Sequence, residues 1–547
     1  MTDELSGVLR LRERGGVMIP SFDVGAEPWL PVVGFDHALE QVSLREVLSR
    51  AHLIRRIAGD TPPMTAALYR LVLALFHRVY GPERRQDWGT LWTEDAFDVT
   101  PLTAYFDANA KQFDLFDSER PFLQCPELPA ERKASVAKLI PHRSVGNNVT
   151  LFDHTTAEDR VELTPAEAAR WLVTAQAFDP GGMKTPYLKE KNSVRAPCSG
   201  LGVVLVEGAT LKETLLLNAV RYAPSAEKPL LTTSEDAPAW EQEPPSPHPG
   251  SRNALGWTDL LTWPARRIRL LPEIVDGVPV VAEAVLTPGE RLLDELPDVE
   301  LMAAYRTPVG ADGKPKPGAP MLPLRLHPVR GIWRHSVELL LEDSWAEERT
   351  RQRPRALKQI AELVEYEHIP PDTLYTLRVF GQQLDAKSSV VEGYLEEEVL
   401  APVALVRATD DALAGLIGSA IQLADEAGAA LRSLQGEYHK SLRARPDVTL
   451  DLAYWPALPQ PFAVFLRAVN DARLEGRPEA RAAATWKRAV TLIAERAAED
   501  WAAGVAAGDR SLSMLGKEHA AFRLRLARIA MAFDAHAAKY LTKGPNR

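Results

Sequence analysis

After about residue 396 the sequence consists of long segments rich in alanine and leucine, and this region constrains the fold most strongly. Apolar residues recur there at intervals of three and four, the pattern of amphipathic helices. The first segment carries them at Leu413, Leu416, Ile417, Ala420, Ile421, Ala424, Ala427, Leu431 and Leu434. Because four such helices bury their stripes together most simply in a bundle, we predict a C-terminal four-helix bundle over residues 396–547.

The other three helices of the predicted bundle follow in order. A shorter helix is expected at 459–476. The next stripe consists of Trp486, Val490, Ile493, Ala497 and Trp501. The last consists of Phe522, Leu526, Ile529, Phe533, His536 and Tyr540. The position of His536 on this stripe predicts a histidine in the core of the bundle rather than a metal ligand.

The first 395 residues have a different pattern, in which proline-rich spacers at 241–251 and 311–320 separate short apolar runs. Such punctuation is typical of a mixed domain with long loops. We predict a helix at 64–81, preceded by Thr61, Pro62 and Pro63 and ended by Gly81. Strands are predicted at 202–208, 266–273 and 278–286. The fold class is therefore α+β, with a large irregular mixed α/β domain at 1–395 before the bundle.

The 547-residue chain has a formal net charge of −10, so its overall field would not attract nucleic acid. Any such contact must be local, and arginine is concentrated at 263–272, 325–335 and 349–358. The charges of the last segment are equally consistent with a surface balanced by nearby acids. No apolar run is long enough for a signal peptide or a membrane span. With only Cys125 and Cys198, the sequence predicts a cytoplasmic protein without disulfides.

One loop, at 176–200, combines glycines with positive charge. Gly181 and Gly182 relieve the steric limits on φ and ψ, so the backbone there can approach another surface closely. The cations are Lys184, Lys189, Lys191 and Arg195. A phosphate chain would be recognised by both features, although a solvated turn is the alternative for this segment taken alone.

Motifs of catalysis give little support for an enzyme. The sequence has no HExxH, and its histidines do not have metal-ligand spacing, which indicates no metal site. The S-x-x-K form at 225–228 lacks its companion motifs. The glycines at 199–204 precede a predicted strand, the wrong order for a dinucleotide fingerprint. No catalytic residue is therefore nominated.

Several separated segments resemble one family, the large subunit CasA of the type I-E CRISPR surveillance complex Cascade. They follow in the family's order along nearly the whole chain, starting with "SFDVGAEPWLPVV" and "VSLREVLSRA". Later segments are "NNVTLFDH", "AFDPGGMK", "TLKETLLLNAV", "DAPAW", "LLTWPARRIRL" and "FGQQLDAKSSVVEGYLEEEV". The resemblance is specific because of this order, and the predicted terminal bundle agrees with it.

The resemblance implies a binding subunit with no catalytic residues, cofactor or metal. Such a subunit recognises the protospacer-adjacent motif (PAM) of double-stranded DNA through the minor groove, starts duplex unwinding for R-loop formation and helps recruit the helicase-nuclease. The implied partners are other Cascade subunits, the CRISPR guide RNA, double-stranded target DNA and its displaced strand, with no membrane. A negative chain suits this role, because a subunit docked on a held guide RNA needs only local basic loops.

The resemblance also places three DNA-contacting elements on this sequence. The family's glycine loop, which lies against the minor groove, corresponds to Gly181, Gly182, Met183 and Lys184. Counting back from the His327–Pro328 step places the lysine finger at Lys314 or Lys316. The wedge, a hairpin whose tip parts the first base pairs, falls at Gln382, Gln383, Ala386, Lys387, Ser388 and Ser389. We expect Lys387 rather than Gln383 at the tip.

A fourth element of the family contacts the 5′ handle of the guide RNA. It corresponds to the segment around Asn147, Asn148 and Phe152, where the aromatic ring could pack on a base. A strand residue in the core is the alternative for Phe152. Two other functions remain open: a cytoplasmic enzyme with an active site in the N-terminal domain, and a purely structural protein adaptor.

Overall fold

The structure is a computed structural model. It describes residues 11–14, 17–142, 160–187, 189–308, 316, 318–341, 351–407, 411–442, 448–505 and 509–541. The chain forms two compact units, Met1–Ala303 with Phe380–Glu396, and Ala304–Val379 with Glu397–Arg547. The predicted division into domains at 1–395 and 396–547 stays a prediction.

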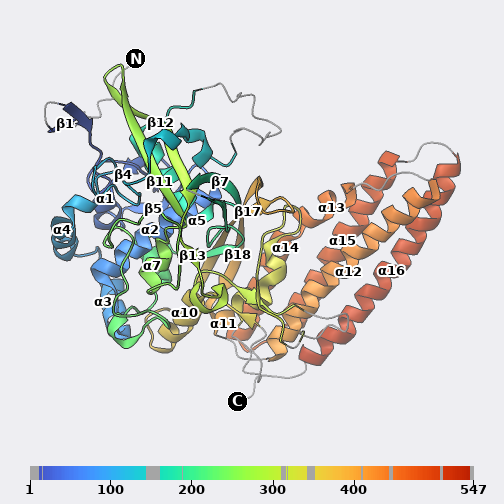
Figure 1. The fold of residues 1–547 in the computed structure, drawn as a ribbon. Coiled ribbons are helices and arrows are strands. Elements are labelled where there is room, and N and C mark those ends of the chain that lie inside the picture. The colour runs from blue at the N-terminus through green and yellow to red at the C-terminus, as the bar shows by residue number, and fades with distance from the viewer. Residues whose placement is uncertain are drawn as a thin grey trace. The chain divides into compact units, whose positions relative to one another are not determined.

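Helix α2 (Pro62–Tyr80) is the central helix of the first unit (Figure 1). Thr61 caps it, its side chain accepting a hydrogen bond from the N–H of Met64, and Gly81 follows its last turn. Residues 63–77 are all buried, so this helix is surrounded rather than laid on a surface. Helix α5 (Pro165–Phe178), which begins with a capping box of Thr164 and Glu167, packs beside α2. The predicted helix at 64–81 is confirmed.

The other described α-helices of this unit are short. They are α1 (Leu44–Ser49), α3 (Arg85–Thr93), α4 (Val99–Ala108), α6 (Leu211–Asn218), α7 (Trp257–Leu261) and α8 (Leu296–Val299). Among them, α1, α4, α6 and α7 pack against α2.

The strands of the first unit form several small sheets. The largest has three strands. Strands β11 (Arg266–Val275) and β12 (Val278–Pro288) form a long antiparallel hairpin, and the short strand β6 (Ala134–Ser135) pairs with the other edge of β12. Strand β3 (Leu30–Gly34) lies between β4 (Leu39–Val42) and β5 (Ile54–Ile57). Two-stranded sheets are formed by β1 (Leu11–Arg14) with β2 (Val17–Pro20), β7 (Gly182–Tyr187) with β8 (Glu190–Ser193), and β10 (Ser251–Arg252) with β13 (Arg291–Leu292).

A further sheet has the order β18–β17–β9. Its members are β9 (Val203–Glu207) and the hairpin strands β17 (Leu374–Leu384) and β18 (Val391–Pro402). The turn of this hairpin belongs to the first unit, because residues 380–396 do. The strands predicted at 202–208, 266–273 and 278–286 are confirmed as β9, β11 and β12.

The second unit contains the predicted four-helix bundle, which Figure 1 shows in orange and red. Its helices are α12 (Asp411–Leu442), α14 (Pro459–Leu474), α15 (Ala480–Val505) and α16 (Asp509–Leu541). Helix α12 packs on both α15 and α16, and α14 packs on α15. The core side chains of the first stripe are all buried, and the indole of Trp486 donates a 2.9 Å hydrogen bond to the carbonyl of Ala420. The α+β fold with a terminal bundle is confirmed.

One residue of the last stripe was predicted wrongly. His536 is exposed, and Ala537 is buried in its place. The residue four positions after Phe533, rather than three, therefore faces the bundle core. A period of 3.6 residues allows either spacing, so the sequence pattern alone could not distinguish them.

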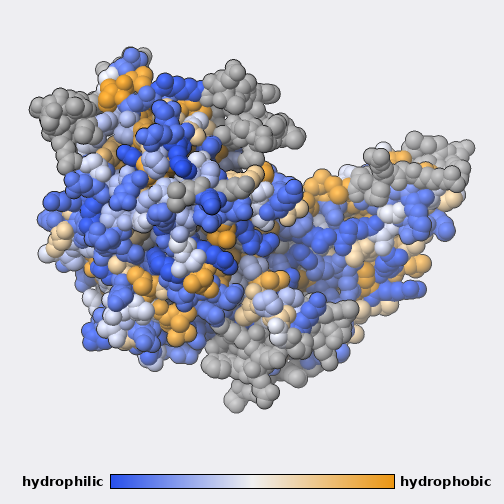
Figure 2. Space-filling model, in the orientation of Figure 1, coloured by the Kyte–Doolittle hydropathy of each residue, from blue (hydrophilic) through white to orange (hydrophobic). Residues whose placement is uncertain are grey.

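The rest of the second unit consists of short elements. They are β14 (Tyr305–Arg306), β15 (Leu322–Pro323), β16 (Arg351–Gln352), α9 (Ser336–Leu340), α10 (Arg355–Glu365), α11 (Val403–Val406) and α13 (Thr449–Tyr454). On the face that Figure 2 shows, hydrophilic residues predominate and hydrophobic residues form small separate patches. Among the described residues, no helix has an apolar stretch of the length needed to cross a bilayer.

Candidate nucleic-acid interface

The glycine loop (residues 181–184) opens the β7–β8 hairpin, and its last three residues belong to β7. Gly182 has a φ of +113°, a conformation that residues with side chains rarely adopt. A Cβ at Gly181 would lie 3.3 Å from the carbonyl oxygen of Ser193 on the facing strand. The backbone therefore requires glycine at position 182, whereas a side chain at position 181 would be crowded by the facing strand. The prediction of a simple loop is corrected here, because residues 182–187 form strand β7, which pairs with β8.

The two side chains that follow the glycines point in different directions. Met183 is 76% exposed. Lys184, in contrast, is largely buried, and its Nζ lies 2.6 Å from Oδ2 of the buried Asp179. Lys184 therefore neutralises a carboxylate of its own chain. Among the side chains that the structure describes, the exposed cations of this hairpin region are Lys189 and Arg195, and the side chain of Lys191 lies outside that description.

Asp179 is shared between Lys184 and the fully buried Arg266, whose Nε lies 2.5 Å from the same Oδ2. Burial by itself would raise the pKa of Asp179, but the charges of Lys184 and Arg266 outweigh that effect and lower it. The carboxylate is thus charged at neutral pH and holds both cations at the base of the loop.

Arg266 also binds the backbone just before the glycines and just after the facing strand β8. Its Nη2 donates hydrogen bonds to the carbonyls of Asp179, Pro180 and Val194. Its neighbour Arg267 is buried as well and pairs with Glu290. The prediction that the arginines at 263–272 make a local nucleic-acid contact is corrected for Arg266 and Arg267, because their guanidinium groups face the interior.

The hairpin turn (residues 385–390) connects β17 to β18. Oδ1 of Asp385 accepts hydrogen bonds from the backbone N–H groups of Ser389 and Val390, at 2.6 and 2.8 Å. Oδ2 accepts one from the N–H of Lys387 at 3.2 Å. The bonds from Val390 and Ser389, the strongest influences, lower the pKa of Asp385. One carboxylate therefore organises the whole turn.

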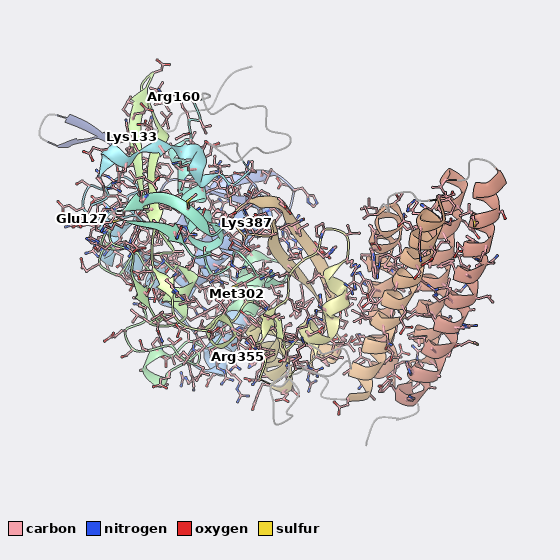
Figure 3. The ribbon with its side chains drawn as sticks, turned by 45° about the vertical axis from the view of Figure 1, so that its right-hand side comes forward. Glu127, Lys133, Arg160, Met302, Arg355 and Lys387 are labelled. Atoms are coloured by element: carbon pink, nitrogen blue, oxygen red, sulfur yellow. The ribbon has the colours of Figure 1, made fainter. Side chains whose placement is uncertain are left out.

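The wedge residues predicted from sequence fall into two groups. Ala386 and Lys387 are exposed at the turn, where Figure 3 labels Lys387, and Ser388 beside them has a φ of +55°. Gln382 and Gln383 instead lie in β17. The Gln382 Nε2 donates to the carbonyl of Phe178 at 2.7 Å, and that of Gln383 donates to Glu392 on β18. Lys387 and Gln383 were the two candidates for the tip of the wedge, and of these only Lys387 lies in the turn.

The glycine loop and the hairpin turn lie next to one another. A Cβ at Gly182 would lie 3.3 Å from the Cβ of Ser389. Both segments line a recess of about 480 Å³. Its other lining residues include Lys138, Ile140, Pro141 and Leu286. The structure thus brings together two elements that were predicted separately.

Of the remaining predicted residues, the structure describes only Lys316. Lys316 is exposed in the second unit, and its backbone N–H donates to the carbonyl of Pro308. Lys314, Asn147, Asn148 and Phe152 lie outside the described residues. The lysine finger and the RNA-handle contact therefore stay predictions.

Metal-ligand clusters and reactive thiols are two features typical of a catalytic site. Among the described residues, no group of three or more His, Cys, Asp or Glu side chains could hold a metal ion. Cys125 and Cys198 are both buried and free. Burial raises the pKa of both thiols, that of Cys198 to about 12, so neither is a reactive thiolate at neutral pH.

Sequence reasoning did not identify three residues that build this site. Asp385 carried a usable signal, since an aspartate ahead of small polar residues between two strands is typical of a turn. Asp179 and Arg266 carried none, because they are 87 positions apart and meet only in the fold.

The fold and the site define the class of this protein: a large α+β chain with a terminal helical bundle and an open recess between two hairpin ends. Residues 24–497 match the model of the CRISPR-associated protein Cse1 family. A CasA/Cse1 protein of Thermus thermophilus is 33% identical over 478 residues, which cover 83% of this chain and 88% of the relative. The chain belongs to the CRISPR-associated Cse1 family.

Solved structures of the family share the fold. The crystal structure of Cse1 from Acidimicrobium ferrooxidans has a TM-score of 0.75 and 27% identity, covering 95% of this chain and 99% of that one. A chain from a structure described as a CRISPR RNA-guided surveillance complex has a TM-score of 0.70 and 23% identity, covering 92% of this chain and 100% of that one.

Proposed function

We propose that this chain is the non-catalytic large subunit of a type I-E Cascade complex, a cytoplasmic assembly with guide RNA and other Cascade subunits. In that role it recognises the PAM of double-stranded DNA through the minor groove and starts duplex unwinding. Family membership supports the assignment to the complex. One observation carries the recognition role: the glycine loop and the hairpin turn meet at Gly182 and Ser389 beside one recess.

The glycine loop is suited to approach a minor groove. Gly181 and Gly182 have no side chains to hold a DNA backbone away, and the conformation of Gly182 is fixed by the hairpin. Met183 projects into solvent, and an apolar side chain in this position can enter between base steps. Because Arg266 binds the carbonyls around the glycines, the loop is preorganised and loses little entropy on binding.

The hairpin turn is suited to separate base pairs. Asp385 holds the turn in one shape, so Ala386 and Lys387 are presented on a rigid support. The cation of Lys387 can contact a phosphate of a separated strand while the turn occupies the space of the lost base pair. The adjacent glycine loop would place this event immediately next to the recognised motif.

The other roles complete the proposal. Lys314 or Lys316 serves as the lysine finger in the minor groove, and the segment with Asn147, Asn148 and Phe152 contacts the 5′ handle of the guide RNA. The displaced strand and the helicase-nuclease are further partners, the latter recruited through a surface of this subunit.

The experiment that tests the proposal is DNA binding by the reconstituted guide-loaded complex, with and without this chain. Targets carry or lack a motif, and variants Lys316→Ala and Lys387→Ala are compared with the unchanged chain. Lys517→Ala, on the exposed face of α16, is the matched control because it removes a charge far from these elements in sequence.

The outcomes separate the three candidate functions. Motif-dependent binding that requires this chain and is weakened by Lys387→Ala or Lys316→Ala, with Lys517→Ala unaffected, supports the proposal. Binding that is the same with and without the chain would favour the structural adaptor. Turnover of a substrate by the chain alone would favour the enzyme.

A further inference from the structure

A second positively charged site lies in the second unit, around the indole of Trp455. This ring is only 1% exposed, and it packs against α12, where a Cβ at Gly428 would lie 2.6 Å from it. The indole N–H donates a 2.9 Å hydrogen bond to Oδ1 of Asp451. The orientation of the ring is therefore fixed by packing on one side and by a hydrogen bond on the other.

Two guanidinium groups cover this ring. The Cζ atoms of Arg330 and Arg334 lie 5.4 and 5.1 Å from its centroid, within the range of cation–π attraction. Both come from the arginine-containing segment at 325–335, which the role of the first unit does not involve. A third arginine, Arg432 on α12, binds the same Asp451 oxygen as the indole, at 3.3 Å.

The charges of this cluster are not balanced. Arg334 pairs with Asp425 at 2.6 Å, and Arg432 pairs with Asp451. No described carboxylate lies within ion-pair distance of Arg330. Burial, then the charges of Arg432 and Arg334, lower the pKa of Arg330, although an arginine with a lowered pKa is still protonated at neutral pH. Among the described residues, three guanidinium groups against two carboxylates leave one positive charge.

His327 adds a neutral donor beside these cations. Its Nδ1 lies 3.1 and 3.2 Å from the backbone N–H groups of Val329 and Arg330 and accepts from both. An Nδ1 that accepts places the ring proton on Nε2, which is then a donor. Burial and the charges of Arg330 and Arg334 lower the pKa of this histidine, so it stays neutral at pH 7.

We propose that Arg330, with Arg432 and Arg334 beside it, binds one backbone phosphate of a nucleic-acid strand. A guanidinium fork matches two phosphate oxygens, and Trp455 holds the fork of Arg330 in place before the strand arrives. A phosphodiester, as a permanent monoanion, neutralises the one excess charge of the cluster. The site carries no base contacts of its own. The proposal rests on the proposed nucleic-acid-binding function and adds to it a contact that does not depend on sequence.

The test measures binding of labelled single-stranded DNA, single-stranded RNA and duplex DNA to the full chain over a series of salt concentrations. We expect Arg330→Ala to weaken binding about threefold to tenfold and to reduce the salt slope by about one. Arg330→Lys keeps the charge and should retain the slope while losing part of the affinity. The three nucleic acids distinguish a displaced strand, a guide RNA and a target duplex as the source of the phosphate.

Arg477→Ala is the matched control, since this arginine is exposed in the same unit and pairs with Glu475. The proposal is overturned if Arg330→Ala leaves affinity and slope unchanged for all three nucleic acids, or if Arg477→Ala has an equal effect. In the assembled complex, Arg330→Ala should weaken motif-bearing and motif-free targets equally. Failure of the recognition role would instead appear as a complex without motif dependence, whatever residue stands at position 330.

Discussion

Gly182 faces Ser389 so closely that a Cβ on the glycine would lie 3.3 Å from the Cβ of the serine. This distance is shorter than an ordinary van der Waals contact between carbon atoms. The φ of Gly182, +113°, independently excludes most side chains. The position therefore joins the glycine loop to the hairpin turn, and a substitution there should disturb both.

Gly182→Ala should cost about 1–2 kcal/mol of folding free energy, mainly through backbone strain, and should weaken motif-dependent DNA binding by the complex. Gly277→Ala is the matched control, because Gly277 has a φ of +80° and nothing within 4 Å of the added Cβ. Urea unfolding and DNA binding are measured for both. Equal loss of DNA binding by the two variants would contradict a specific role of the loop.

Lys387→Ala should slow the opening of a target duplex about threefold to tenfold, equivalent to roughly 0.7–1.4 kcal/mol in the transition state. A fluorescent base analogue next to the motif reports the opening. On a target whose first pairs are already mismatched, the variant should behave as the unchanged chain does, because no opening is then required. An equal defect on the mismatched target would assign Lys387 to binding rather than to separation.

Lys184→Met should destabilise the chain by about 1–3 kcal/mol, since Asp179 would keep only Arg266 as a charged partner. The pKa of Asp179 is lowered in the folded chain, so its stabilising contribution is present above the usual carboxylate pKa of about 4 and is lost as pH falls through the folded value. Without Lys184 this loss should begin at higher pH.

Urea unfolding at a series of pH values measures that shift, and Asp179→Asn supplies the comparison. Adding Lys184→Met to Asp179→Asn should cost less than adding it to the unchanged chain, because the carboxylate it neutralises is absent. Additive costs would show that the two side chains do not interact.

The pKa of Glu397 is shifted in the direction opposite to that of Asp179, so Glu397→Gln should change the pH dependence of stability in the opposite sense. Burial raises the pKa of Glu397 to about 6, against 4.5 in its ordinary state, although a hydrogen bond from the N–H of Ile332 opposes this. A raised folded pKa means that the charged carboxylate destabilises the fold above about pH 6, by about 2 kcal/mol. The glutamine should therefore stabilise the chain at pH 7 and make no difference below the ordinary pKa.

Glu398→Gln, at an exposed position of the same strand, is the control for that measurement. If Glu398→Gln gives the same pH profile, general surface charge rather than the burial of Glu397 is responsible.

Gly415→Ala should destabilise the bundle by about 1–3 kcal/mol, because the added Cβ would lie 2.1 Å from the ring of Tyr540 on α16. Gly418→Ala, on the same helix and with nothing within 4 Å, should stabilise it by up to about 1 kcal/mol. Thermal unfolding compares the two. A gain in stability from both would mean that Tyr540 does not set the spacing of α12 and α16.

Local pattern was sufficient to predict much of the fold. The periodicity of α12 and the caps of α2 depend only on residues close together in the sequence. Helices and strands could therefore be located from the sequence. The prediction that His536 lies in the bundle core was wrong, because a helix with 3.6 residues per turn allows a spacing of three or four residues after Phe533. The numerous two- and three-stranded sheets could not be predicted, since their pairing depends on residues distant in sequence.

The candidate site was predictable only in its surface residues. Lys387 could be placed at a turn from the family resemblance and its polar neighbours. The sequence gives no sign that Lys184 is buried, because its partner Asp179 looks like any helix-ending aspartate until Arg266 is placed beside it. Lys184 is buried and Lys387 is exposed because of their tertiary contacts, and the charges along the sequence do not reveal those contacts.

Arg266 binds the carbonyls around the glycine loop from inside the protein. Because of this support, substitutions that alter the loop's shape and substitutions that alter its exposed surface occur at different residues. The shape of the loop depends on a side chain that never reaches solvent, whereas the residues presented outward, such as Met183 and Arg195, contribute little to that shape. Outward residues can therefore be exchanged without refolding the support. Under the proposed recognition role, a lineage under pressure to read a different motif could vary them one at a time, and a protein engineer could randomise the same positions on an unchanged scaffold.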